Sequence, residues 1–281
     1  MLKVAGWLIH IAINILMVIY VFATSFQNAK TQKFIWRQLH FWYLVLFVFI
    51  MFKELYYIIA PVRGLIYDDI LIQIDRWIFG ADPTVVLYKI ANPFLTELLQ
   101  IVYGTFYLLP IILGSDLIIQ KKISEFDYSA FIIVYGFCLS FIGYILVPAI
   151  GPRFMLHNFE MNNIEMPGIF ITDFLREITN VAESIPSGTM NPAAVVQRDA
   201  FPSGHTQITL LVIFLSVKFR SRFKWFLVID GTLLIFATVY LRYHYVVDLI
   251  GGFFFMFFTL WSGKYIYMWF IKMKFVQQIR K

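Results

Sequence analysis

Charged residues are scarce in this sequence. Of its 281 residues only 14% are charged, while 60% are hydrophobic, whereas a soluble domain carries about 25% charged residues. There is too little polar surface to coat a water-soluble globule, so much of the surface must face something apolar, for which lipid is the obvious candidate. The single cysteine, Cys138, lies within an apolar run, which excludes a disulfide framework.

A concentrated basic patch is also lacking. The net charge of +6 is spread over short connecting segments rather than gathered in one tail. This distribution is typical of the cytoplasmic loops of a membrane protein, and it argues against nucleic acid as a partner.

Long apolar runs predict the fold. A membrane-spanning helix needs about 20 mostly apolar residues. We predict an all-α fold, a polytopic transmembrane helical bundle of about seven spans that forms a single integral membrane domain over residues 1–281. The candidate spans, of which the fifth is short and is expected to begin earlier, are Val4–Phe26, Phe41–Ala60, Pro93–Ile119, Tyr128–Ala149, Thr206–Val217, Trp225–Leu241 and Val246–Met268.

The connecting loops alternate in charge. Basic side chains fill the first, third and fifth connections and the C-terminal tail, whereas the second and fourth connections are rich in acidic side chains. By the positive-inside rule the basic loops are cytoplasmic, which places the N-terminus outside and the C-terminus inside.

Two of the external connections are expected to be structured. In Gly64–Gly80, apolar residues recur at helical spacing with acidic residues on the other side, which predicts an interfacial helix. The fourth connection, residues 150–204, is a long external loop with a short helix predicted around Ile171–Thr179.

Three polar clusters stand at the ends of otherwise apolar spans. They are Pro148–Arg153, Arg198–His205 and Arg242–Asp248. Each adjoins a predicted external loop, so we expect them to meet at one membrane surface. The predicted location of the active site is therefore the extracytoplasmic (periplasmic or luminal) side.

Histidines in two of these clusters suit phosphorus chemistry. His244 and Asp248 are four residues apart, so they share one face of a helix. The aspartate can fix the tautomer of His244 and leave its other ring nitrogen free as a nucleophile. His205 can then protonate the departing oxygen as a general acid.

Arginine and a helix start supply groups for phosphate. Arginine offers a planar fork of donors, and the N-terminus of the fifth span adds amide donors and a positive dipole end. The candidate phosphate ligands are Arg153, Arg198, Ser203, Gly204 and Arg242.

Each cluster alone also has an ordinary explanation. A single interfacial histidine is commonly an anchor, an arginine at a helix end commonly snorkels, and Pro-Ser-Gly is a common helix start. Their occurrence together on one side favours function. Two histidines and an aspartate are also metal-ligand types, but the flanking arginines make a cation unfavourable, so neither a metal nor another cofactor is predicted.

Two segments resemble a known family. Phe201-Pro-Ser-Gly-His-Thr206 and His244-Tyr-Val-Val-Asp-Leu-Ile-Gly251 resemble the second and third motifs of the type-2 phosphatidic acid phosphatase (lipid phosphate phosphatase) superfamily. Pro148–Arg153 and Asp75–Pro83 look like the branch that includes inositol phosphorylceramide synthases. The resemblance covers roughly residues 70–255, the expected catalytic core.

The resemblance implies a helical bundle, no metal and a covalent phosphohistidine. His244 would be the nucleophile, Asp248 its orienting group and His205 the acid, with Ser203, Gly204 and Arg153 around the phosphate. The sequence departs from the family motifs where lysine, proline and arginine are usual. These positions hold Leu146, Phe154 and Thr238, and Arg242 is the nearest substitute for the missing arginine.

Three functions remain open. The first is a membrane phosphatase of lipid phosphates or pyrophosphates, with a lipid phosphate in the bilayer as its substrate. The second is a phosphotransferase in which a polar acceptor such as inositol or a sugar attacks the phosphohistidine, and Gly204 favours the phosphatase over it. The third is a non-enzymatic transporter, which the retained polar groups argue against.

Overall fold

The structure is a computed structural model that describes residues 2–31, 33–62 and 64–279. Within this described part, helices are joined by turns and loops, and no strand is present. The predicted all-α class is confirmed. The chain forms two compact units, Met1–Ile58 and Ile59–Lys281, which we describe separately; a single domain over residues 1–281 stays a prediction.

The first unit is a helical hairpin built from α1 (Leu2–Thr31) and most of α2 (Phe34–Val62). Asn14 near the start of α1 donates to Glu54 near the end of α2, with Nδ2 2.6 Å from Oε1. Ser25 near the end of α1 lies 3.3 Å from His40 on α2. These two contacts show that the helices run antiparallel.

The second unit is a bundle of longer helices with shorter ones in its connections. Four helices pack around α12, which contacts α13, α14, α7 and α6. The elements are α3 (Asp68–Phe79), α4 (Pro83–Tyr88), α5 (Pro93–Gly104), α6 (Leu108–Ile119), α7 (Ile123–Leu146), α8 (Pro152–Met155), a 3₁₀ turn (Phe159–Met161), α9 (Asn162–Glu165), α10 (Thr172–Ala182), α11 (Pro192–Val195), α12 (Gly204–Lys218), α13 (Lys224–Tyr240) and α14 (Val246–Ile279).

The centre of this bundle combines apolar packing with one satisfied polar group. Ile208, Leu211 and Leu215 of α12 are fully buried. Gln207, also buried, accepts from Ser140 Oγ of α7 at 2.6 Å and donates to Thr259 Oγ1 of α14 at 3.0 Å. Because a buried amide is costly unless it is hydrogen-bonded, Gln207 fixes the register of three helices.

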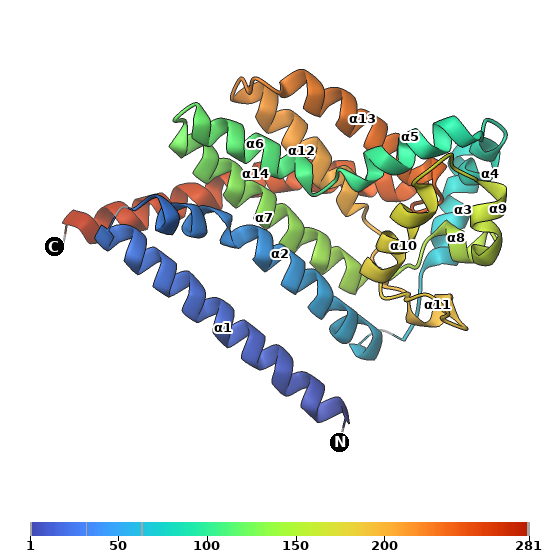
Figure 1. Cartoon of the computed structure of the whole chain (residues 1–281), viewed down its shortest axis with the longest axis horizontal. Helices are drawn as coiled ribbons and strands as arrows, with labels where there is room; N and C mark the ends of the chain where they lie inside the picture. The colour runs from blue at the N-terminus through green and yellow to red at the C-terminus, as the bar shows by residue number, and fades with distance from the viewer. Residues whose placement is uncertain (1, 32, 63, 280–281) are drawn as a thin grey trace. The chain divides into compact units, whose positions relative to one another are not determined.

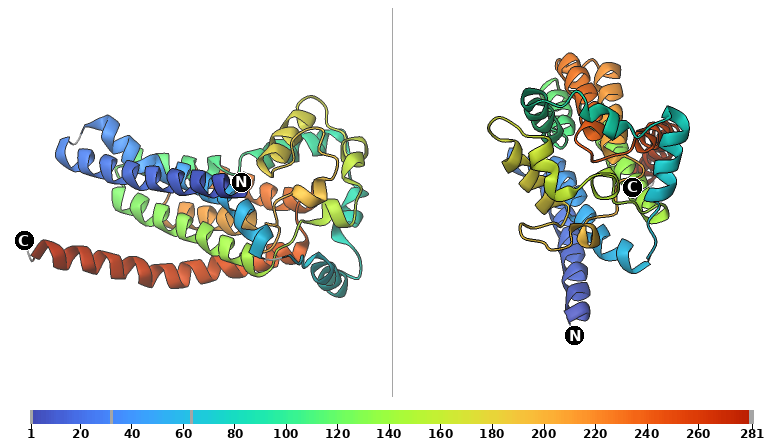
Figure 2. Two further views of the ribbon diagram at one scale, coloured as in Figure 1. Left: turned by 90° about the horizontal axis from the view of Figure 1, so that it is seen from below. Right: turned by 90° about the vertical axis from the view of Figure 1, so that its right-hand side faces the viewer.

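The short helices of the loops gather at one end of the second unit. Figure 1 shows α3, α4, α8, α9, α10 and α11 together at that end, and the left view of Figure 2 shows the long helices of this unit running away from it. The helix predicted around Ile171–Thr179 is α10, and the one predicted within Gly64–Gly80 is α3.

All seven predicted spans coincide with helices. Among the residues that the structure describes, four helices are long and apolar enough to cross a membrane, and a fifth span results if α5 and α6, bent by 53°, count as one. The remaining two, α12 and α13, have 15 and 17 residues, fewer than the about 20 of a perpendicular crossing. The count of seven stays a prediction.

Candidate active site

Backbone hydrogen bonds join the three polar clusters. Ala200 N donates to Ala149 O at 3.1 Å, Arg153 N donates to Arg242 O at 3.1 Å, and Ser203 N donates to Asp248 O at 2.9 Å. The clusters lie far apart in the sequence and meet in space, whereas the membrane surface on which they lie stays a prediction.

Two glycines permit this close approach. Gly151 has a φ of 91°, a region that disfavours side chains, and a Cβ there would lie 2.6 Å from Tyr243 O. A Cβ on Gly252 would lie 2.5 Å from Ser203 O. Any larger residue would force the clusters apart.

Two buried carboxylates of α3 accept hydrogen bonds from the segments that carry the first and third clusters. Asp68 accepts from Ile150 N and Gly151 N at 3.0 and 2.9 Å, and from the Tyr245 hydroxyl at 2.9 Å. Asp75 accepts from the amides of residues 246 and 247 at 2.9 and 2.8 Å. Through these hydrogen bonds, α3 fixes the first cluster and the start of α14 in position relative to one another.

α3 differs in one respect from the interfacial helix that the sequence predicts, because two of its acidic side chains face the protein rather than water. Asp68 and Asp75 are buried, whereas Ile70 and Trp77 are exposed. Burial raises the pKa of both carboxyl groups, and the backbone N–H donors oppose that rise. The carboxylates face inward because two loops present amides to them, which helical periodicity alone does not indicate.

His244 is held in a defined tautomer. Its Nδ1 lies 2.9 Å from Ala200 O and 3.3 Å from Asp248 Oδ2. Asp248 Oδ2 also accepts from Tyr245 N at 2.8 Å, so it acts as an acceptor. The ring proton therefore resides on Nδ1 and leaves Nε2 with its lone pair.

The other ring nitrogen of His244 faces the second histidine. His244 Nε2 lies 3.3 Å from His205 Nδ1. The ring of His205 stacks on Tyr103 at 4.8 Å and contacts Phe106 at 4.3 Å between centroids. His244 is buried while His205 is half-buried, so His205 is the more accessible of the pair.

Arg153 is the buried cation next to this pair. Its guanidinium pairs with Glu183 and donates to Asn180 Oδ1 at 3.1 Å, and it lies 4.8 Å from the centroid of the Tyr243 ring. Burial lowers the pKa of His244 to about 4; the charges of Asp199 and Glu183 oppose this shift, and that of Arg153 adds to it. His244 is thus neutral at neutral pH.

Two acidic residues at this site were not singled out from the sequence. Asp199 is half-buried, and burial followed by the charge of Glu183 raises its pKa to about 7. Asp199 belongs to the predicted cluster Arg198–His205, and its position within that cluster is the sequence signal that could have identified it. Glu183 lies 22 residues before His205, and nothing in its local sequence indicated a contact with Arg153.

The side chain of Arg242, another predicted phosphate ligand, points away from the histidine pair and toward Glu165. Arg242 has a φ of 67°, and its guanidinium binds Glu165 Oε2 at 2.5 Å and lies 5.1 Å from the centroid of the Tyr88 ring. Its backbone carbonyl, rather than its side chain, contacts the first cluster through Arg153 N. Phosphate binding by Arg242 stays a prediction.

The start of α12 has other roles besides any contact with phosphate. Ser203 is the N-cap, and its Oγ accepts from Thr206 N at 3.2 Å. A Cβ on Gly204 would lie 2.2 Å from the Tyr144 hydroxyl, so a larger residue there would displace the Tyr144 side chain. Arg198 is half-buried on the same segment.

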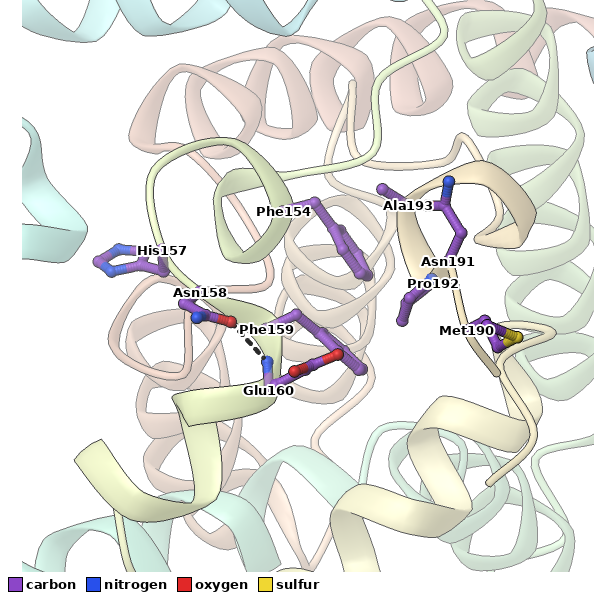
Figure 3. A pocket seen from close by; sticks show the side chains of 9 residues that line it. All are labelled: Phe154, His157, Asn158, Phe159, Glu160, Met190, Asn191, Pro192 and Ala193. Atoms are coloured by element: carbon purple, nitrogen blue, oxygen red, sulfur yellow. Dashed lines mark hydrogen bonds between the residues drawn. The ribbon is translucent and has the colours of Figure 1, made fainter. Parts of the chain in front are cut away.

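A surface pocket of about 250 Å³ lies beside Arg153. Its floor contains Phe154 and Phe159, whose rings stack at 5.0 Å and both face the Arg153 guanidinium. Figure 3 shows the side chain of His157 pointing away from the centre; its Nε2 lies 2.9 Å from Thr84 Oγ1. The lining residues are Phe154, His157, Asn158, Phe159, Glu160, Met190, Asn191, Pro192 and Ala193.

No group of three or more histidine, cysteine, aspartate or glutamate side chains suited to a metal ion occurs in the described part of the chain. Function without a metal cofactor stays a prediction.

Together these features define a polytopic helical membrane protein that carries groups suited to phosphate chemistry. The family model of the PAP2 superfamily matches residues 69–262, which is more than half of the chain, so the protein belongs to the PAP2 superfamily. Members are generally phosphatases, and membership supports hydrolysis of phosphate esters. Comparisons with curated proteins and with solved structures give no match.

Removal of one α3 carboxylate should destabilise the protein. In Asp75→Ala two amides at the start of α14 lose their acceptor, and we expect a loss of about 1–3 kcal/mol, measured by thermal and denaturant unfolding in detergent. Asp69→Ala, on the exposed side of the same helix, is the matched control and should change stability by less than about 0.5 kcal/mol. Equal losses in both variants would contradict the role of Asp75.

The protonation of His244 gives a pH prediction. Because burial disfavours the cation, the ring should stay neutral until the pH falls through about 4, instead of protonating near 6.5. ¹⁵N NMR of histidine-labelled protein, with His244→Gln used for assignment, should show a proton on Nδ1 at pH 6. Titration near 6.5, or a proton on Nε2, is incompatible with the geometry described above.

Proposed function

We propose that the protein is a membrane phosphatase of lipid phosphates or pyrophosphates that acts through a phosphohistidine on His244. One observation carries the proposal: the Nδ1 side of His244 is held by Ala200 and Asp248, and its Nε2 faces His205 at 3.3 Å. A nucleophile oriented on one side and a proton donor opposite it are the groups that such a reaction needs.

The reaction proceeds in two balanced steps. His244 Nε2 attacks phosphorus and the bond to the lipid oxygen breaks, while His205 gives a proton to that oxygen. Water then attacks the phosphohistidine and gives a proton back to His205. The N–P bond breaks, which releases inorganic phosphate and restores both rings.

Arg153 is the proposed main phosphate ligand, because it is buried and its charge acts on His244. Glu183 occupies its guanidinium in this structure, so an incoming phosphate must displace that carboxylate. Ser203, Gly204 and Arg198 are proposed to contribute around the start of α12, and Arg242 only after release from Glu165.

A phosphotransferase is the second candidate, and the pocket beside Arg153 favours it. Stacked aromatic rings together with Asn158 and Asn191 in the lining suit a polyol such as inositol or a sugar, whose ring packs on aromatic faces while its hydroxyls bind amides. The motif likeness to inositol phosphorylceramide synthases supports the same reading. Product analysis with and without a polyol acceptor separates free phosphate from a transferred phosphate.

The loss of activity on substituting each histidine should depend differently on the leaving group of the substrate. General acid catalysis contributes about 10²–10⁴-fold, so His205→Ala should lower the turnover of an alkyl lipid phosphate by that factor. It should largely spare p-nitrophenyl phosphate, whose leaving group needs no proton. His244→Ala should abolish both activities. Equal losses on both substrates in His205→Ala, or activity in His244→Ala, would reject the assigned roles.

The same assay tests the proposed extracytoplasmic location. p-Nitrophenyl phosphate is charged and crosses membranes poorly, so sealed right-side-out vesicles should hydrolyse it without detergent. Activity that emerges only after permeabilisation would place the site on the cytoplasmic side.

A further inference from the structure

The polarity of α10 is the reverse of that of an ordinary surface helix. Arg176 is 3% exposed and Thr172 is 2% exposed, whereas Phe174 is 67% and Ile178 is 51% exposed. Phe170, four residues before Phe174, is 89% exposed. Phe174 and Ile178 are four residues apart and share one face of the helix, and Phe170 lies in the bend just before it. Arg176 and Thr172 thus face inward, while Phe170, Phe174 and Ile178 form an exposed apolar stripe.

The inward polar side is firmly held. Arg176 donates to Met166 O at 2.6 Å and to Asn163 Oδ1 at 3.1 Å. Glu97 of α5 accepts from the amides of Ile169 and Ile171 at 2.9 and 2.8 Å and from the Thr172 hydroxyl. These contacts fix how the helix is rotated about its axis, so the exposed stripe follows from the fold.

α10 also lies where the membrane-spanning segments end. Asn180 and Glu183, at its last turn and just beyond, contact Arg153, only seven residues after the end of α7 at Leu146. α10 packs on α5, which forms a bent candidate span with α6 and exposes Leu98 and Ile101. The apolar stripe is therefore carried by a helix that packs against a candidate membrane span with exposed apolar side chains of its own.

We propose that α10 is a membrane-surface helix and that Phe170, Phe174 and Ile178 lie in the boundary between the lipid headgroups and the acyl chains. An amphipathic helix of this kind buries its apolar face about 5–10 Å into that boundary. The partner is the bilayer itself, in the leaflet next to the histidine pair. Asp173 and Glu177 flank the stripe, so binding relies on apolar burial rather than on anionic lipids.

The proposed membrane contact of α10 also brings the bilayer near the active site. The helix that rests on the bilayer is the one that presents Asn180 and Glu183 to Arg153. A lipid arriving from the same leaflet meets α10 and the buried cation together. The membrane contact stands apart from the catalytic proposal, since it concerns the outer face of the helix.

Spin labels on single cysteines test the proposal. Because Cys138 is the only native cysteine, Cys138→Ser provides a clean background for Phe174→Cys and for its neighbour Asp173→Cys. In phosphatidylcholine liposomes, the label at 174 should be more accessible to oxygen than to the water-soluble nickel complex NiEDDA, and the label at 173 should show the opposite. Ile178→Cys and Glu177→Cys repeat the pair one turn later, in case one variant does not fold.

The readout does not require activity, so failure of the phosphatase proposal would leave it intact. Labels at 174 and 178 that are as accessible to NiEDDA as the label at 173 would overturn the membrane contact. Labels broadened by spin–spin coupling, and sharpened on dilution with unlabelled protein, would show a second copy on this face and would also overturn it.

Discussion

The buried carboxylates of Asp68 and Asp75 are the constraint on which the site depends. Seven residues apart on α3, they face the same side of the helix and accept backbone amides from two distant loops. Charged acceptors make the stronger hydrogen bonds, and burial keeps water from competing for them. The loop that bears Arg153 and the helix that bears Asp248 are therefore placed relative to one another by a third element.

Within that frame, charge is balanced around one neutral histidine. Burial lowers the pKa of His244, and the cation of Arg153 lowers it further, whereas the charges of Asp199 and Glu183 raise it. A phosphate that displaces Glu183 would bring negative charge to Arg153 in its place. The buried arginine is then paired both before and after substrate binds, which avoids the large cost of an uncompensated buried charge.

Some of this architecture was predictable from the sequence because it is local. The apolar runs predicted the helices. The contact of His244 with Asp248 was predicted as well, but its stated basis, a shared helix face, was wrong, because His244 lies two residues before α14 begins at Val246. Contacts across long sequence separations were not predictable, such as Glu183 with Arg153 or Asp75 with the start of α14, because no periodicity links their positions. Arg242 shows the converse, since its proximity to His244 in sequence suggested a phosphate ligand while its left-handed backbone directs the side chain to Glu165.

The central claim is that phosphorus becomes bonded to His244, and rapid-quench trapping tests it most directly. Purified protein mixed with ³²P-labelled lipid phosphate and quenched in alkali within milliseconds should yield an acid-labile, base-stable phosphopeptide containing His244. In His205→Ala, ³²P-labelled p-nitrophenyl phosphate should phosphorylate the same histidine. The phosphohistidine should accumulate there, because no general base remains to activate water. Label mapped to His205, or turnover without any trapped phosphoenzyme in His244→Ala, would contradict the account.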